Sequence, residues 1–336
     1  MKIDAGIPTN DPREAGKATK ILEDAGYDGA FTAETSHDPF LPLVTAAIET
    51  EKIELVTSIA VAFARNPMIL ANLGYDLQKL SKGRFILGLG SQIRPHITKR
   101  FSMSWSSPAA RMKELVEAIR AIWDCWQNES KLDFRGEYYT HTLMTPFFNP
   151  GPNPYGLPKI YVAAVGPLMT KSVAQSADGL LVHPFHTPKY MQETTLPIVE
   201  EGLSSVGKTR SDFDLSISIM TATGLTEESY LNAVNACKSG IAFYASTPAY
   251  KGVLEAHGYG KLQVKLNLLS KEGKWKEMTS LIDDELLNTV AVVAETPEAV
   301  AEEIKKRYGD QGDRITPALY SGENGLASRV IDALRS

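Results

Sequence analysis

The feature that most constrains this chain is a repeated alternation between short apolar runs and longer amphipathic segments. Most runs are followed by a segment with helical spacing of apolar residues, which is typical of parallel βα units. The runs are nearly continuous in apolar residues, as expected for strands covered on both faces. An open doubly wound sheet is one outcome, but eight runs favour an α/β fold of the TIM-type (β/α)8 barrel class. The eight predicted strands are residues 3–8, 29–34, 54–63, 84–90, 159–166, 178–185, 213–224 and 313–319.

The segment after the third run carries the clearest helix signals. Asn66 is a good N-cap, Pro67 suits the first helical turn, and Gly83 suits the C-terminal stop. We expect the next helix to begin at Ser107-Pro108 and its apolar stripe to be core. That stripe consists of Met112, Leu115, Ile119, Ile122 or Trp123, and Trp126.

Two stretches depart from the alternation. Residues 128–158 contain one short strand-like segment and a Pro- and Gly-rich stretch, which indicates a loop because the βα pattern resumes directly after it. Residues 226–290 are too long for one crossover and predict a helical insertion between strands seven and eight. Within it, Tyr244 and Tyr250 are the residues most expected to face a pocket. A barrel needs roughly 250 residues, so we expect residues 1–336 to form a single domain.

Composition excludes several classes of function. The net charge of −5 gives no global reason to bind nucleic acid or an anionic membrane. No apolar run approaches the roughly 20 residues needed to span a bilayer, and the first residues lack the apolar core of a signal peptide. The two cysteines, Cys125 and Cys237, have no zinc-ligand or redox spacing and are expected to be buried free thiols. The sequence therefore predicts a cytoplasmic protein.

Polar residues follow the second predicted strand. In a β/α barrel the active site lies at the carboxyl ends of the strands, so Glu34 and His37 are candidates for proton transfer. The alternative is a loop whose polar groups cap the next helix. Asp38 precedes a proline and is better explained as a turn residue.

Small residues follow the third and fourth strands. Thr57-Ser58-Ile59-Ala60 and Gly88-Leu89-Gly90-Ser91-Gln92 would leave room for a flat ring system. The second stretch begins like a dinucleotide fingerprint, but its third glycine is missing and we expect no helix directly after it. The basic cluster that comes next is either a solvated loop or an anion clamp. It consists of Arg94, His96, Lys99 and Arg100.

The fifth and sixth strands end in further candidates. Ala163-Ala164-Val165-Gly166-Pro167-Leu168 places Gly-Pro at a helix start, where free backbone N–H groups bind phosphate well. His183 and His186 follow the sixth strand. We expect no metal, since no His-x-x-x-His spacing exists. Neither a nucleotide-binding P-loop nor a Gly-x-Ser-x-Gly elbow is present, which argues against nucleoside triphosphate hydrolysis and an α/β-hydrolase.

These segments, in their order and spacing, resemble the luciferase-like monooxygenase superfamily over almost the whole chain, and within it the F420-dependent oxidoreductase branch. The segments that carry the resemblance are AETSHDPFLPL (33–43), IAVAFARNPMILANLGYDLQKLSKGRFILGLGSQ (59–92), IYVAAVGP (160–167), ADGLLVHPF (177–185), IAFYASTPAY (241–250) and ETPEAVAEEI (295–304).

The resemblance implies a flavin or deazaflavin ring in the barrel mouth, supported by a non-prolyl cis peptide bond at Ser58-Ile59. It implies a cofactor phosphate near Ser91, Val165, Gly166, Pro167 and His183. With the strand-end arguments, the candidate cofactor contacts are Ser58, Ile59, Gly90, Ser91, Gln92, Arg94, His96, Ala164, Val165, Gly166, Pro167 and His183.

The implied function is hydride transfer between the deazaflavin coenzyme F420 and a small organic substrate, with His37 or Glu34 handling a proton. Relatives often have an adjacent acid–histidine pair, whereas Glu34 and His37 are separated by two residues. The basic cluster favours F420, whose tail is polyanionic. The alternatives are an FMN-dependent monooxygenase supplied with reduced flavin by a partner reductase, and a ligand-binding barrel without turnover. We expect a homodimer or a higher homo-oligomer.

Overall fold

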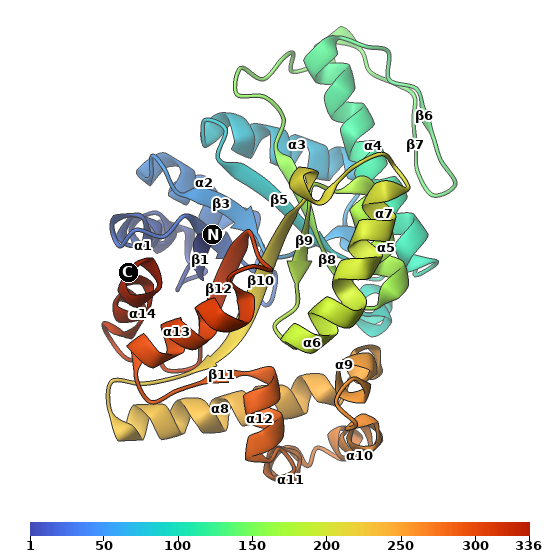
Figure 1. Ribbon diagram of the computed structural model, residues 1–336. Helices are drawn as coiled ribbons and strands as arrows, with labels where there is room; N and C mark the ends of the chain where they lie inside the picture. Colours follow the sequence, from blue (N-terminus) through green and yellow to red (C-terminus); the bar gives the residue numbers. More distant parts are fainter.

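Eight parallel strands close into a barrel in the computed structural model, which describes residues 1–336 (Figure 1). Each strand pairs with the next in the order of the chain, and the last returns to the first through Lys2 opposite Arg314 and Ile3 opposite Ile315. The predicted TIM-type (β/α)8 barrel is confirmed. Its strands are β1 (Lys2–Gly6), β2 (Gly29–Thr32), β3 (Glu54–Thr57), β5 (Phe85–Gly90), β8 (Lys159–Ala164), β9 (Gly179–Val182), β10 (Asp214–Ala222) and β12 (Arg314–Leu319).

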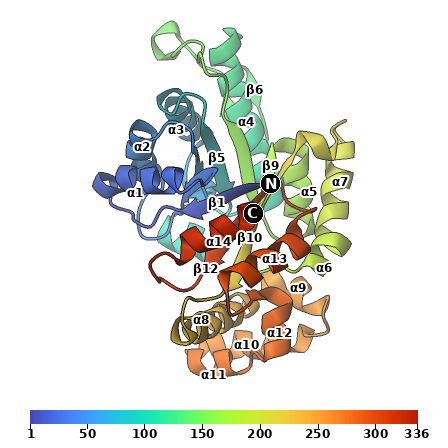
Figure 2. The same ribbon diagram turned by 60° about the vertical axis from the view of Figure 1, so that its left-hand side comes forward.

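Helices surround the barrel, as Figure 2 shows from a second direction. The N-cap prediction for α3 is confirmed, because the Asn66 side chain accepts a hydrogen bond from the Met68 N–H at 2.8 Å. The outer elements are α1 (Pro12–Asp24), α2 (Phe40–Glu49), α3 (Pro67–Leu80), α4 (Pro108–Asn128), α5 (Pro167–Ser176), α6 (Pro188–Tyr190), the π-helical turn η4 (Met191–Thr195), α7 (Leu196–Ser204), the 3₁₀ turn η5 (Arg210–Asp212), α13 (Pro297–Tyr308) and α14 (Leu326–Arg335).

The main core lies between the strands and these helices. The apolar stripe of α4 is fully buried, as its spacing predicts. Trp123 on this stripe donates its indole N–H to the carbonyl oxygen of Ala71 at 3.0 Å. A Cβ atom at Gly74 would come within 2.9 Å of the Trp123 ring, so α3 needs a glycine there to approach α4. Both cysteines are buried and free.

Three local features differ from the sequence prediction. The third strand breaks at residues 58–59 and continues as β4 (Ala60–Val61) and the 3₁₀ turn η1 (Ala62–Ala64). The second strand ends at Thr32, so Glu34 lies beyond it. The loop after β5, where no helix was expected, is helical and contains the π-helical turn η2 (His96–Arg100).

The irregular stretch after α4 forms a small hairpin of β6 (Phe134–Arg135) and β7 (Thr140–His141), followed by the 3₁₀ turn η3 (Pro146–Phe148). The carboxylate of Glu114 on α4 holds this hairpin, since it accepts the N–H groups of residues 137, 138 and 139 at 2.7–2.9 Å. This stretch is a loop excursion, as predicted.

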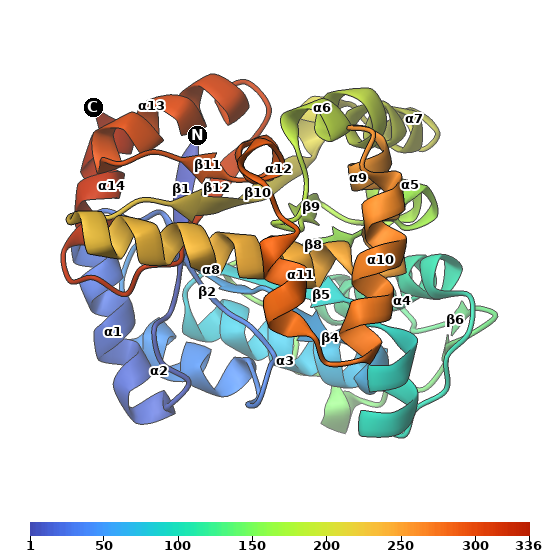
Figure 3. The same cartoon turned by 90° about the horizontal axis from the view of Figure 1, so that it is seen from below.

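The insertion between the last two barrel strands forms a second helical layer with its own core. We call it the cap. It comprises α8 (Glu227–Ala245), η6 (Pro248–Tyr250), α9 (Lys251–Glu255), α10 (Gly260–Lys271), α11 (Trp275–Ser280) and α12 (Asp284–Val290), and β11 (Val292–Val293) then pairs with β10. Figure 3, viewed from below Figure 1, shows α8, α10 and α11 in front of the barrel. The cap follows the carboxyl end of β10 and covers that end of the barrel.

A buried ion-pair network closes the opposite, amino-terminal end. Arg314 donates two hydrogen bonds to the Asp4 carboxylate at 2.7 and 2.8 Å and also donates to Glu54. Lys2 completes this group by binding Glu54 at 2.8 Å. A Cβ atom at Gly29 would lie 2.4 Å from both Arg314 and Asp4, so the pair occupies space that only glycine leaves free.

None of the helices is both long enough and apolar enough to cross a membrane.

Candidate active site at the carboxyl end of the barrel

The predicted site residues follow five strands that are consecutive neighbours in the barrel: β2, β3, β5, β8 and β9. Glu34 and His37 follow β2, and Ser58 and Ile59 follow β3. The remaining candidates follow β5, β8 and β9. The fold therefore brings all of them to one side of the barrel mouth, and the cap follows the next strand, β10.

Glu34 is held by two donors. Its side chain is 8% exposed, and one carboxylate oxygen accepts the N–H of Val61 at 2.7 Å and the guanidinium of Arg65 at 2.5 Å. Arg65 also binds Asp38 at 2.8 Å. These contacts fix the position of the carboxylate. Glu34 thus fixes Arg65 and the backbone after β4.

His37 differs from Glu34 in its surroundings. Its side chain is exposed and forms no hydrogen bond within the chain. Both ring nitrogens are free to exchange protons with a ligand or solvent, which a proton carrier requires.

The third and fifth strands approach each other closely at the mouth. The peptide bond between Ser58 and Ile59 is cis. A Cβ atom at Gly90 would lie 2.9 Å from the side chain of Ile59, and one at Gly88 would clash with the carbonyl oxygen of Thr57. Gly90 therefore lets the apolar side chain of Ile59 lie against bare backbone, and Gly88 lets the two strands approach.

The basic cluster is exposed but anchored. Ile97 is buried beneath it, and Arg100 donates to the carbonyl oxygen of Thr35 in the loop after β2. Arg94, His96 and Lys99 are exposed. The cluster therefore forms a cationic turn connected to the loop that carries His37.

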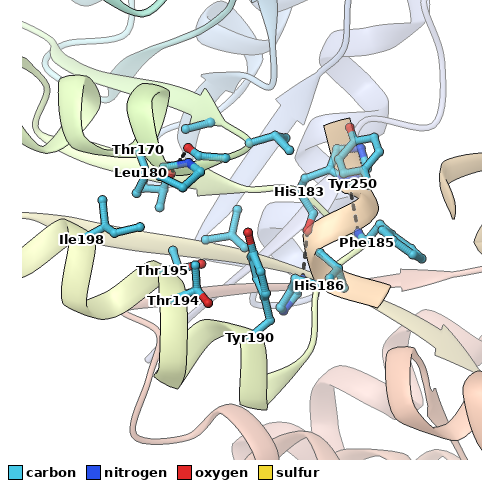
Figure 4. Close-up of a pocket in the computed structure, with 16 residues that line it drawn as sticks. Thr170, Leu180, His183, Phe185, His186, Tyr190, Thr194, Thr195, Ile198 and Tyr250 are labelled. Atoms are coloured by element: carbon cyan, nitrogen blue, oxygen red, sulfur yellow. Dashed lines mark hydrogen bonds between the residues drawn. The ribbon is translucent and has the colours of Figure 1, made fainter. Parts of the chain in front are cut away.

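A pocket lies between β8, β9, α5 and the cap (Figure 4). Its lining includes five predicted cofactor contacts, Ala164, Val165, Gly166, Pro167 and His183. Gly166 has φ +79°, and the N-terminus of α5 has no side-chain cap. Unsatisfied N–H groups and the helix dipole make such an end favourable for an anion.

His183 is held in one neutral form. Its Nδ1 accepts the N–H of Phe185 at 3.1 Å, so the ring hydrogen resides on Nε2. Its ring lies 4.6 Å from the rings of Tyr244 and Tyr250, measured between centroids. Burial lowers the pKa of His183 to about 3, with a smaller effect from His186. His183 is therefore a hydrogen-bond donor and not a base.

The structure adds residues that sequence reasoning missed. Arg65 was not singled out, although it lies beside the Asn66 cap within the family-like segment, because nothing local pairs it with Glu34. Tyr190 lines the pocket from the short helix after β9. His186, which the sequence placed beside His183, also lines it; its Nδ1 contacts the His183 carbonyl oxygen at 2.9 Å, while its buried Nε2 has no partner. No sequence pattern predicts that this nitrogen lacks a partner.

Known proteins resemble the chain in sequence and in fold. The family model described as luciferase-like monooxygenase matches residues 2–314. An uncharacterised protein of Mycobacterium tuberculosis is 51% identical over 335 residues, which cover 100% of this chain and 98% of the relative. A 5,10-methylenetetrahydromethanopterin reductase of Archaeoglobus fulgidus is 28% identical over 298 residues, covering 85% and 83% of the two chains.

A solved structure of similar fold is the coenzyme F420-dependent tetrahydromethanopterin reductase of Methanopyrus kandleri. It superposes with a TM-score of 0.80 at 19% identity and covers 99% of this chain and 97% of the other. The family match spans nearly the entire barrel and all the strand ends described above. The chain therefore belongs to the luciferase-like monooxygenase family of oxidoreductases.

Proposed function

We propose that this protein transfers a hydride between coenzyme F420 and a small organic substrate. The observation that carries the proposal is the presence of two separate anion-attracting features at one end of the barrel, the N-terminus of α5 and the cationic turn at Arg94–Arg100. F420 has a phosphate and a polyanionic glutamyl tail, whereas FMN has a single phosphate. The names of the F420-dependent relatives support the same cofactor.

The residues present fit this cofactor. Ile59, which lies against Gly90, offers an apolar surface for a ring, and the uncapped start of α5 offers N–H groups for a phosphate. Arg94, Lys99 and Arg100 would hold the tail. When bound, F420 supplies a hydride donor or acceptor at its deazaflavin ring.

In this proposal His37 carries the proton that accompanies hydride transfer. A neutral imidazole can accept a proton from an alcohol oxygen or, once protonated, donate one to a developing alkoxide. Glu34 is the second candidate, but its carboxylate is already paired with Arg65 and the Val61 N–H. We therefore assign Glu34 a positioning role.

The experiment is to titrate the purified protein with F420 and, separately, with FMN, and to follow absorbance and fluorescence of each cofactor. We expect F420 to bind more tightly than FMN and its affinity to fall as salt rises, since exposed charges are screened over roughly 8–10 Å. Tighter binding of FMN would overturn the choice of cofactor.

A reduced-flavin monooxygenase is the second candidate, favoured by the family in which the chain falls. It would consume oxygen in the presence of reduced FMN and a separate reductase. Oxygen uptake with reduced FMN but none with reduced F420 would select it.

We also infer that the protein self-associates through α2 and α3. α2 has no charged residue from Phe40 to Ile48, yet Leu41 and Ile48 are 58% and 64% exposed, and Ile69 on α3 is 52% exposed. An uncharged apolar face of this kind is typical of contacts between identical subunits. Light scattering should give a mass above that of one chain. The Ile48→Lys variant should give a lower measured mass than the wild type.

A further inference from the structure

One wall of the barrel mouth consists of aromatic residues that join the barrel to the cap. Tyr244 at the end of α8 and Tyr250 in η6 both contact His183 at the end of β9. Tyr320 follows β12, and its hydroxyl would lie 3.2 Å from a Cβ atom at Gly240 of α8. We call Tyr244, Tyr250, Tyr320 and His183 the neutral wall. They come from two strand ends and two cap elements, so only the folded cap brings them together.

The polar atoms of the neutral wall are not used by the protein. The hydroxyl groups of Tyr244, Tyr250 and Tyr320 form no hydrogen bond within the chain, and burial rather than bonding raises the pKa of all three. His183 uses Nδ1 for the backbone and keeps the Nε2 hydrogen free. These four polar atoms are not among the fully buried atoms that lack a partner, whereas His186 Nε2 is. Three hydroxyls and one imidazole N–H are therefore available to a ligand.

The contacts that define the neutral wall are with uncharged groups, since His183 accepts the Phe185 N–H and packs against the rings of Tyr244 and Tyr250. The neighbours that influence the pKa of Tyr250 and Tyr320 are Tyr244 and Cys237, and His186 influences His183. Burial lowers the pKa of His183 to about 3, so it stays uncharged. A carboxylate or phosphate placed here would lose its hydration without gaining a cation, which is unfavourable. Hydroxyl and N–H groups can form hydrogen bonds with an uncharged carbonyl or hydroxyl oxygen, which loses little hydration energy on binding.

The cationic turn of the mouth lies away from the neutral wall, whereas the N-terminus of α5 lies beside it, because β8 pairs with β9. The turn at Arg94–Arg100 follows β5, and the N-terminus of α5 follows β8, whereas the wall is built on β9, β12 and the cap. His183 and Tyr250 form the border, because they also line the pocket at α5 (Figure 4). In the proposed function the anionic parts of the cofactor occupy the cationic turn and the N-terminus of α5.

We propose that the neutral wall receives the substrate and that this substrate is an uncharged, partly apolar organic molecule with a carbonyl or hydroxyl group, not a carboxylated or phosphorylated one. The inference rests on the proposed function for its location beside the cofactor. Tyr244, Tyr250 and Tyr320 bind the substrate's oxygen function or its ring, and His183 donates from Nε2.

The test compares two probes of the same shape and different charge, benzamide and benzoate. Binding to the full-length protein is measured by isothermal titration calorimetry at pH 7, with and without F420. We expect benzamide to bind at least about 10-fold more tightly than benzoate. Tyr244→Phe and Tyr320→Phe should each weaken benzamide binding about 2- to 10-fold, the usual effect of one hydrogen bond. Tyr230→Phe, on the same helix α8 but near its other end, is the control and should change nothing.

The outcomes separate this inference from the proposed function, since F420 binding is read independently from the cofactor's own fluorescence. If F420 binds but benzoate equals or exceeds benzamide, or neither probe binds, the neutral wall does not select uncharged substrates and the inference is overturned. If F420 fails to bind while benzamide still prefers the wild-type wall over the Phe variants, the cofactor assignment fails and the selectivity of the wall stands.

Discussion

The two ends of the barrel differ in how their polar groups are paired. At the amino-terminal end, Arg314 is 3% exposed, and its guanidinium is paired with Asp4 and Glu54. At the carboxyl end, His183 and three tyrosines carry polar atoms without protein partners and are uncharged. The amino-terminal end contains buried charges that satisfy one another, and the neutral wall of the carboxyl end contains uncharged groups that remain available.

This difference indicates which end stabilises the fold and which end binds a ligand. A buried charge is tolerated only when its partners are fixed, so a network such as that of Arg314 cannot also serve a ligand. Asp214 belongs to the same end: despite burial, Lys159 and Tyr161 hold its pKa below the usual value. Unpaired donors at the carboxyl end weaken the fold locally but can exchange partners when a ligand arrives.

His37→Ala should give the largest effect. Loss of general acid–base catalysis slows a reaction about 10²–10⁴-fold, so turnover with F420 should fall in that range while F420 affinity stays near that of the wild type. Steady-state kinetics and cofactor titration measure the two quantities. Ser36→Ala in the same loop is the control. Unchanged turnover would show that His37 is only a loop residue, and lost cofactor binding would make it a cofactor ligand.

Arg314→Leu should be the most damaging change at the amino-terminal end. Removing one partner of a buried pair leaves Asp4 uncompensated and costs about 3–5 kcal/mol of stability. Urea unfolding followed by circular dichroism measures this loss. Arg329→Leu breaks an exposed pair with Glu298 and should cost no more than about 1 kcal/mol. Equal losses in the two variants would contradict the distinction between the ends.

Acid should weaken the carboxyl end before the amino-terminal end. Burial lowers the pKa of His183 to about 3 and of His186 to about 4, both below the unfolded value near 6.5. The unfolded chain therefore takes up protons first, and stability present above pH 6.5 is lost as the pH falls toward 4. Each histidine contributes at most about 1.4 kcal/mol per pH unit.

The matching measurement is the stability of wild type and His186→Asn across pH 4–7. The variant should lose less stability than the wild type between pH 6.5 and pH 4. Parallel curves for wild type and His186→Asn would show that the buried imidazole does not couple to folding. Glu54 and Asp214, whose pKa values are lowered, lose their contribution only in more acidic solution.

Neutralising Arg94, Lys99 and Arg100 together should give the smallest effect. Exposed charges contribute about 0.2–1 kcal/mol each, so F420 affinity should fall about 10-fold at low salt and converge with that of the wild type at high salt. Fluorescence titration at several salt concentrations measures this. Lys79→Ala with Lys82→Ala, which removes exposed cations near the end of α3, should leave affinity unchanged. If the triple variant binds F420 like the wild type, the turn is only solvated surface.

The barrel could be predicted from the sequence because its signals are local and repeated. Apolar strand runs, the Asn66–Pro67 helix start and the α4 stripe depend on near neighbours in the chain. The same signals placed the polar strand ends at one end of the barrel. The length of residues 226–290 was sufficient to predict the helical insertion.

The remaining features could not be predicted because they depend on contacts distant in sequence. The pairing of Glu34 with Arg65 requires the segments that follow β2 and β4 to meet, and no spacing rule connects them. The helical turn after β5 has no capping residue from which the sequence could predict it. The neutral wall needs Tyr320 and the cap in place, so Tyr320 had no signal in the sequence.

The short pairing of β10 with β11 has a consequence for how such proteins diversify. Thr221 pairs with Val292 and Ala222 with Val293, so the chain leaves for the cap and returns at adjacent strands, about 4.8 Å apart. An excursion whose two ends already meet can be lengthened, shortened or exchanged at little cost in chain entropy. The cap is thus a segment that can be exchanged while the barrel stays the same. A graft of another relative's segment between residues 222 and 292 should change which molecules the barrel accepts and leave the strands of the barrel unchanged.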